Sequence, residues 1–296
     1  MNNMNVYRVS PGPHVRSRNT AGDVMYDVIL ALVPAVLFGI WKFGAHALML
    51  MLSGVLAAVL VEYAIGCLIG RDTLRDGSAT LSGLLLALTL PPDATVLMAF
   101  VGGAAAVAFK AVFGGLGKNR LNPALVGRCV VSAAFGAAMT AFLKQSGWTA
   151  ELSSGAEILR SLIGSRSAVI GGSVIALLLG GAYLLWTETI SWHIPTGMVC
   201  AYLIVSMLFG GPSAGLQQTV FFLAGGGALA AVFMATDPVT SPVTDSGKLV
   251  FGLFAGIAAA LIGRAAGPAE SACLGVLAAE LISPFIERFT VERMYR

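Results

Sequence analysis

Three ionisable side chains lie inside long apolar stretches of the sequence, where a charge is costly. Glu62, Lys110 and Glu280 stand seven, six and six residues before the ends of apolar segments at positions 69, 116 and 286. At a helical rise of 1.5 Å per residue, the three groups share a depth of about 10 Å. We expect Lys110 to pair with Glu62 or Glu280, either as a structural ion pair or as part of a cation path. Snorkelling of each side chain to the lipid headgroups is the alternative.

A second candidate is the segment 236–245, Thr-Asp-Pro-Val-Thr-Ser-Pro-Val-Thr-Asp. Two prolines four residues apart exclude a regular helix. The hydroxyl and carboxyl groups, those of Asp237 and Thr240 among them, are oxygen ligands that a hard cation such as sodium accepts together with freed carbonyls. The alternative is a solvated connection between two helices.

A third candidate is the glycine-rich turn 114–124, which contains Lys118, Asn119 and Asn122. Asn122 stands where it can cap a helix that begins at Pro123, because proline favours the first helical position. With Lys118 nearby, such a helix N-terminus could hold an anionic or electron-rich group, such as a phosphate or the edge of a flavin ring. A plain, well-capped turn is the alternative.

The composition requires lipid around most of the chain. Of 296 residues, 57% are hydrophobic and only 11% are charged, against about 25% charged in ordinary soluble domains. This excludes a soluble enzyme and a nucleic-acid binder, and the net charge of +3 indicates no polyanionic partner. The cysteines stand singly, which predicts small buried hydrophobes and no metal or iron–sulfur site within this chain; they are Cys67, Cys129, Cys200 and Cys273.

Apolar runs of about 20 residues predict an all-α polytopic membrane protein with about ten transmembrane helices. Two of them are short or broken: 79–90 stops at Pro91-Pro92, and 194–209 stops at Gly210-Gly211-Pro212. The ten expected segments are 24–43, 45–69, 79–90, 94–116, 124–143, 166–187, 194–209, 214–235, 247–263 and 269–286.

The two halves of the chain echo each other. The stretch 102–109 leads to Asn122-Pro123, and the similar stretch 225–233 leads to Asp237-Pro238. Paired interruptions point to a site at a repeat interface, although glycine-rich membrane helices also resemble one another by chance. With this matching, full crossings would make the repeat parallel, and re-entrant short helices would make it inverted.

These segments divide the chain into five parts, which are a cytoplasmic N-terminal segment (1–23), a first membrane repeat (24–143), an extracytoplasmic loop (144–165), a second membrane repeat (166–286) and a cytoplasmic tail (287–296). Most of the 18 lysines and arginines, Arg128 among them, then fall in loops on the side of the termini. The excess places both termini in the cytoplasm.

Several motifs resemble the D subunit of the Rnf ion-translocating oxidoreductase complex and, more distantly, the B subunit of the sodium-pumping NADH:quinone reductase. The resemblance spans nearly the whole chain. Its motifs are 10–14 (Ser-Pro-Gly-Pro-His), 76–80 (Asp-Gly-Ser-Ala-Thr), 117–119 (Gly-Lys-Asn), 122–124 (Asn-Pro-Ala), 192–195 (Trp-His-Ile-Pro) and, most specifically, 234–244.

This resemblance implies a bacterial inner-membrane complex of six subunits, so the partners would be the A, B, C, E and G subunits. The complex would couple electron transfer between reduced ferredoxin and NAD to the movement of sodium or protons. The fold would be like that of urea transporters, with two five-helix repeats. The family carries FMN attached to the threonine of an outer Ser-Gly-Ala-Thr motif, and a non-covalent riboflavin is associated with its membrane core.

At the attachment motif the sequence departs from the family pattern, because it reads Ser154-Gly155-Ala156-Glu157. A phosphoester needs a hydroxyl, which Glu157 does not supply. We therefore expect no covalent FMN here, or a flavin that is held differently.

The chain alone has no complete active site and no nucleotide-binding Gly-x-Gly-x-x-Gly motif, so NAD chemistry belongs to a partner. A membrane subunit of a redox-driven ion pump is the leading hypothesis. The alternatives are a structural scaffold without its own redox cofactor and a small-solute channel, the latter suggested by fold alone.

Overall fold

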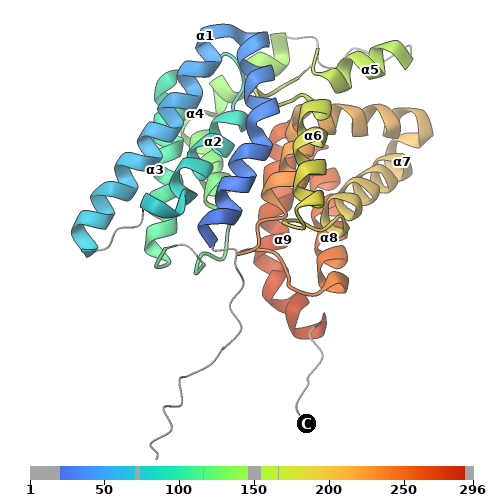
Figure 1. The fold of residues 1–296 in the computed structure, drawn as a ribbon. Coiled ribbons are helices and arrows are strands. Elements are labelled where there is room, and N and C mark those ends of the chain that lie inside the picture. Colours follow the sequence, from blue (N-terminus) through green and yellow to red (C-terminus); the bar gives the residue numbers. More distant parts are fainter. Residues whose placement is uncertain (1–20, 71–73, 116, 146–154, 166, 291–296) are drawn as a thin grey trace, which may run out of the picture.

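The computed structural model describes residues 21–70, 74–115, 117–145, 155–165 and 167–290, and these residues form helices and short connections without any strand. Helices α1 to α4 make one group and α6 to α9 make the other, as the colours of Figure 1 show. The all-helical architecture is therefore confirmed. The helices are α1 (Ala21–Ile69), α2 (Ser78–Thr89), α3 (Val96–Val112), α4 (Pro123–Gln145), α5 (Gly155–Ile163), α6 (Val174–Trp186), α7 (His193–Phe222), α8 (Asp245–Ile262) and α9 (Pro268–Thr290).

Two of these helices contain a sharp turn at a glycine. Gly44 has φ 69° and ψ −154°, and α1 doubles back there, so its two arms are the expected segments 24–43 and 45–69. Gly211, followed by Pro212, has φ 81° and turns α7 in the same way. Positive φ values of this size favour glycine, which has no Cβ to clash with the backbone.

One of the two expected short helices is longer than expected. Helix α2 has 12 residues and is about 18 Å long, well below the hydrocarbon thickness of about 30 Å. The first arm of α7 begins at His193 and runs to Gly211, about 27 Å, which is close to a full crossing. The broken element of the second half is instead the stretch after the turn, which ends in two π-helical turns, η2 (Leu223–Gly227) and η3 (Ala230–Met234).

The two groups run in opposite directions through the membrane. The start of α1 lies beside the end of α6, where the Tyr183 hydroxyl donates to Asp27 at 3.3 Å. Further along the same arm, Gly39 packs against Ile170, which precedes α6. The first segments of the two repeats are therefore antiparallel, and the repeat is inverted.

The packing also corrects the expected matching of the two halves. In order along the chain, α3 and α8 are the fourth segments of their repeats, and each packs closely on the second segment. Gly103 of α3 lies against the backbone of Gly54 in α1, and Gly252 of α8 lies against the backbone of Ile194 in α7. Helix α3 thus corresponds to α8 and not to the stretch 225–233, so the statement that full crossings give a parallel repeat was wrong.

The expected helix 166–187 begins later than predicted. Residues 167–173 are buried, non-helical chain, and the helix starts at Val174. The N–H of Ile170 donates to the Leu90 carbonyl at 3.0 Å, and the N–H of Gly171 donates to the Leu88 carbonyl at 2.9 Å. Carbonyls at the end of the half-helix α2 are thereby satisfied inside the protein, as the absence of water in a membrane requires.

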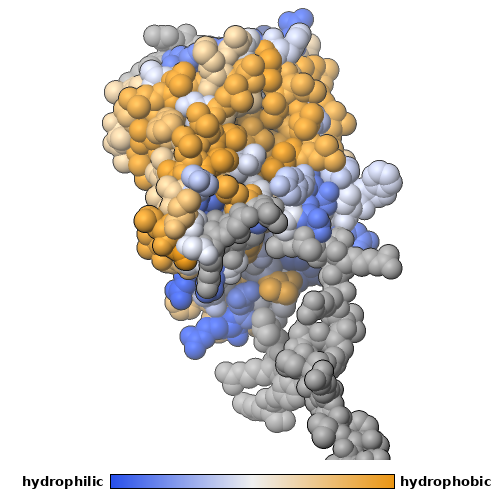
Figure 2. Space-filling view, turned by 60° about the vertical axis from the view of Figure 1, so that its left-hand side comes forward, coloured by the Kyte–Doolittle hydropathy of each residue, from blue (hydrophilic) through white to orange (hydrophobic). Residues whose placement is uncertain are grey.

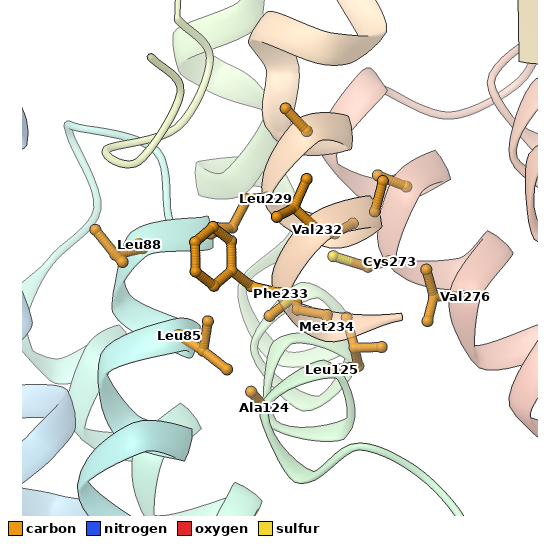
Figure 3. Packing of buried hydrophobic residues seen from close by; sticks show 14 of the residues in the cluster. Leu85, Leu88, Ala124, Leu125, Leu229, Val232, Phe233, Met234, Cys273 and Val276 are labelled. Atoms are coloured by element: carbon orange, nitrogen blue, oxygen red, sulfur yellow. The ribbon is translucent and has the colours of Figure 1, made fainter. Parts of the chain in front are cut away.

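The two interrupted elements meet at the centre of the molecule. Figure 3 shows Leu229 and Phe233 of the second repeat facing Leu85 and Leu88 of α2. Side chains of α4 and α9, such as Leu125 and Val276, close the cluster from the other side. The π-helical stretch is thus held between helices of both repeats.

The outer surface is that of a membrane protein. Figure 2 shows a broad hydrophobic face with polar residues gathered toward its ends. Among the described residues, four helical stretches are long and apolar enough to cross a bilayer; they are Gly22–Ile69, His193–Gly227, Asp245–Ile262 and Pro268–Thr290. The short amphipathic helix α5 lies within the expected loop 144–165, at the end opposite to the last turn of α9 (Figure 1).

Candidate functional site

A pocket lies where the two repeats meet, at the end of the molecule that holds the start of α1 and the end of α6. It encloses about 620 Å³ of space between its walls when the open mouth is counted. One wall is apolar and comes from α1, α2, α6 and η3; it includes Met25, Val28, Leu81, Leu85, Leu184 and Phe233. The polar wall contains Ser78, Lys110, Asn119, Asn122, Thr236 and Asp237.

Lys110 reaches this pocket from the last turn of α3 and is held by residues of α1 and α2. Its Nζ lies 2.9 Å from Oε2 of Glu62, and both side chains are at most 5% exposed. The same Nζ donates to the Ser78 hydroxyl at 2.7 Å, and that hydroxyl donates to Asp76 at 2.6 Å. Of the two expected partners of Lys110, the structure brings Glu62 to it and not Glu280, and burial excludes the snorkelling alternative.

Asn122 caps α4, as the sequence predicts. Its Oδ1 accepts from the N–H of Ala124 at 3.0 Å, and Pro123 occupies the first helical position. Its own N–H donates to Oε2 of Glu280 at 2.9 Å. The positive end of the α4 dipole thus faces the carboxylate of Glu280 in α9. The protein itself thus places a carboxylate at this helix end.

The loop after η3 brings further oxygens to Glu280. The Thr240 hydroxyl donates to Oε1 of Glu280 at 3.0 Å. The Asn122 side chain contacts the Met234 carbonyl at 3.3 Å and Oδ2 of Asp237 at 3.5 Å. Burial raises the pKa of Asp237 to about 6, although the N–H of Val239 opposes this shift. A carboxylate, a hydroxyl, a backbone carbonyl and a second carboxyl therefore gather near Asn122.

The side-chain oxygen of Asn119 is buried without a hydrogen-bond partner. Its side chain is 4% exposed and lines the pocket, and its Oδ1 has no hydrogen-bond partner. A buried acceptor without a partner costs about 1–3 kcal/mol, so a donor that reached this oxygen would remove that cost. Lys118, the neighbouring candidate, is exposed and does not line the pocket.

The candidate residues at the attachment motif lie elsewhere. Gly155, Ala156 and Glu157 form the first turn of α5, at the opposite end of the molecule from the pocket (Figure 1). Ser154 falls outside the described residues. The candidates of the sequence analysis therefore divide into one group around the pocket and another at the far end.

A second hollow adjoins the pocket and has about 530 Å³ of space. The two share Thr189, Ile190, Thr236 and Pro238, so they are neighbours across these residues. Hydroxyl groups of Ser191 and Ser241 line the second hollow, with Lys248 at its side.

Sequence reasoning missed a buried ion pair near the centre. Arg128, expected in a cytoplasmic loop, is 2% exposed within α4 and pairs with Glu270 of α9. Its guanidinium also donates to the carbonyl of Thr89, the last residue of α2. The sequence itself indicated a buried position for Arg128, because this residue lies inside the segment 124–143 that the hydropathy assigns to a helix. Within the residues that the structure describes, no three or more His, Cys, Asp or Glu side chains are placed to hold a metal ion.

Comparison with known proteins finds similarity along nearly the whole chain. Residues 8–296 match the model of the NQR2, RnfD, RnfE family. The chain is 36% identical to the D subunit of the proton-translocating ferredoxin:NAD+ oxidoreductase complex of Clostridium ljungdahlii, with 97% of this chain and 95% of that protein covered. It is 34% identical to the D subunit of the Na+-translocating ferredoxin:NAD+ oxidoreductase complex of Acetobacterium woodii, with 100% and 96% covered.

A third relative has a less specific name. The chain is 30% identical to the D subunit of the ion-translocating oxidoreductase complex of Klebsiella pneumoniae, with 98% of this chain and 99% of that protein covered. These matches cover nearly the whole chain and so include the helices of both inverted repeats. The chain belongs to the NQR2, RnfD, RnfE family of membrane proteins.

Proposed function

We propose that this chain is a membrane subunit of an electron-transport complex, in which electron transfer between ferredoxin and NAD drives the movement of sodium or protons. Within that complex, the pocket between the repeats holds the ring of a non-covalent flavin. The observation that carries this assignment is the unpartnered Oδ1 of Asn119 beside a pocket that also presents the ammonium group of Lys110 as a donor.

The residues of the pocket fit a flavin ring. The pyrimidine edge of a flavin has one N–H between two carbonyls, so it needs one acceptor and additional donors. Asn119 supplies the acceptor and Lys110 supplies a donor, and the wall with Leu85 and Phe233 suits the apolar dimethylbenzene end. The hydroxyl-lined second hollow suits a polyol chain such as ribityl. When bound, a flavin supplies one-electron and two-electron chemistry that no side chain offers.

A quinone headgroup fits the same pocket less well. It carries two acceptors and no donor, so it leaves Asn119 Oδ1 without a partner. The imide edge of a flavin satisfies that oxygen.

Covalent FMN does not belong to this proposal. The acceptor position of the motif holds Glu157, which has no hydroxyl, and α5 lies at the far end from the pocket. The flavin that we propose for the pocket is non-covalent riboflavin.

The cation path that we propose begins beside the same pocket. Glu280, Thr240, Asp237 and the Met234 carbonyl converge around Asn122, at the junction of a broken element and a helix N-terminus. Carboxylates and freed carbonyls at such a junction are the groups that bind sodium or carry protons in transporters. Relatives at 36% and 34% identity are named for protons and for Na+, so overall identity does not decide the cation.

The orientation and partners follow from the same family. The relatives are named as subunits of multi-subunit complexes, and the chain is a multi-pass membrane protein. We place it in the bacterial inner membrane with both termini in the cytoplasm, because the positive charges favour that side. Its partners would then be the A, B, C, E and G subunits.

The flavin assignment is tested in the intact complex. Cells that express the complex with Asn119→Leu, or with the exposed Arg120→Gln of the same turn as a control, yield purified complexes whose flavins are extracted and separated into riboflavin and FMN. We expect Asn119→Leu to lose most of the riboflavin and Arg120→Gln to retain it, with FMN equal in both. Full riboflavin in Asn119→Leu would favour a scaffold without its own redox cofactor.

A further inference from the structure

The Lys110 side chain is held in a way that a buried structural ion pair does not need. Glu62 and Ser78 occupy two of the three N–H donors of its ammonium group, and within the described part of the chain nothing accepts from the third. Lys110 lines the pocket, whereas Glu62 does not. The pair is therefore a dipole whose positive end faces the pocket.

The surroundings of Lys110 strengthen this polarity. Helix α2 begins at Ser78, so the positive end of its dipole lies beside the same ammonium group. The acid of this cluster, Asp76, accepts from the N–H and the hydroxyl of Ser78, at 2.9 and 2.6 Å. The hydroxyl oxygen is thereby turned toward Lys110 and accepts its N–H. Glu62 thus holds the ammonium group directly and Asp76 holds it through the Ser78 hydroxyl, and neither of these carboxylates lines the pocket.

We propose that Lys110 sets the reduction potential of the flavin in this pocket, and that Glu62 is the positioning residue that holds its ammonium group against the pocket wall. This inference rests on the flavin assignment above. The reduced form of a flavin carries negative charge on its pyrimidine edge at neutral pH. A cation on that side stabilises the reduced form more than the oxidised form and raises the potential.

The charge arrangement predicts the direction in which each variant shifts the reduction potential of the flavin. Glu62→Gln removes the negative partner but keeps Lys110, so the pocket becomes more positive. The double variant Glu62→Gln/Lys110→Met removes both charges together, and no buried carboxylate is left without a partner. The two variants are expected to move the potential in opposite directions. A purely structural pair predicts changes in stability and no such opposition.

The experiment is a redox titration of riboflavin absorbance in the purified complex. We expect the double variant to bind reduced riboflavin at least tenfold more weakly relative to the oxidised form, which lowers the midpoint by about 30 mV for a two-electron couple. Glu62→Gln is expected to raise it. Arg264→Met is the control, because Arg264 is an exposed cation that lines neither hollow; it leaves the midpoint unchanged.

The failure of this inference can be told apart from failure of the flavin assignment. If Asn119→Leu leaves riboflavin bound, the pocket is not the flavin site and both proposals fall. If Asn119→Leu releases riboflavin while both Glu62 variants titrate like the parent complex, or shift in the same direction, only the role of Lys110 falls.

Discussion

Arg128 of α4 and Glu270 of α9 form an ion pair across the two repeats, with Nη2 and Oε1 2.8 Å apart. Arg128 Nε and Glu270 Oε2 are buried without a hydrogen-bond partner, so the ion pair is made through Nη2 and Oε1 alone. Because the guanidinium also donates to the carbonyl of Thr89, one side chain connects α4, α9 and the end of the half-helix α2.

Loss of one partner from this pair is expected to be costly. Arg128→Met leaves the Glu270 carboxylate without its cation and should destabilise the fold by about 3–5 kcal/mol. The double variant Arg128→Met/Glu270→Met carries no unpaired charge, so it should be more stable than the single variant. Thermal unfolding in detergent micelles shows which of the two variants is more stable, and the exposed Arg120→Met is the control. A double variant less stable than Arg128→Met would contradict this reading.

Close helix packing at Gly83 gives a second prediction. A Cβ at this position of α2 would lie 2.6 Å from the Gly54 carbonyl oxygen and 2.8 Å from the Val55 Cα, and backbone atoms cannot move aside cheaply. Gly83→Ala should therefore lower the stability by about 1–3 kcal/mol. Gly136→Ala is the control, since nothing lies within 4 Å of its added Cβ. Equal melting temperatures of the two variants would rule out the close approach of α2 and α1.

The expected lack of covalent FMN can be reversed by one substitution. Glu157→Thr restores the Ser-Gly-Ala-Thr motif in the first turn of α5, and the threonine supplies the hydroxyl that a phosphoester requires. In cells that contain the flavin transferase, a fluorescent band should survive denaturing electrophoresis for Glu157→Thr and be absent for the parent chain. Glu157→Gln, which also lacks a hydroxyl, is the control. A fluorescent parent chain would refute the argument from Glu157.

Asp237 should make stability depend on pH. Its pKa rises from 3.8 to about 6 because it is buried, so the folded chain holds this proton more tightly than the unfolded chain. The stabilisation is present below about pH 4 and is lost as the pH rises through 6. Asp237→Asn should remove this part of the profile. Melting temperatures recorded from pH 4 to 8 would contradict the shift if the two profiles stayed parallel.

The parts of this fold that the sequence predicts are those set by local chemistry. The lengths of the apolar runs predicted both arms of α1, and Asn122 before Pro123 predicted the start of α4. Counting residues from the segment ends placed Glu62 and Lys110 at the same depth, and they pair.

The parts that failed depend on contacts between distant segments. Residues 167–173 lie in a segment apolar enough for a helix, yet the N–H groups of Ile170 and Gly171 pair with the end of α2, about 80 residues earlier. Glu280 shares the depth of Lys110 but lies against Asn122, because inversion brings α9 to α4 and not to α3. The partner of Arg128 likewise depends on the antiparallel packing of α4 and α9.

A density map of the intact complex with riboflavin bound shows where the flavin ring lies. We expect a planar three-ring density in the pocket between the repeats, with its pyrimidine edge against Asn119 Oδ1 and the ammonium group of Lys110. Riboflavin resolved at another place, with only lipid, detergent or water against Asn119, would contradict it.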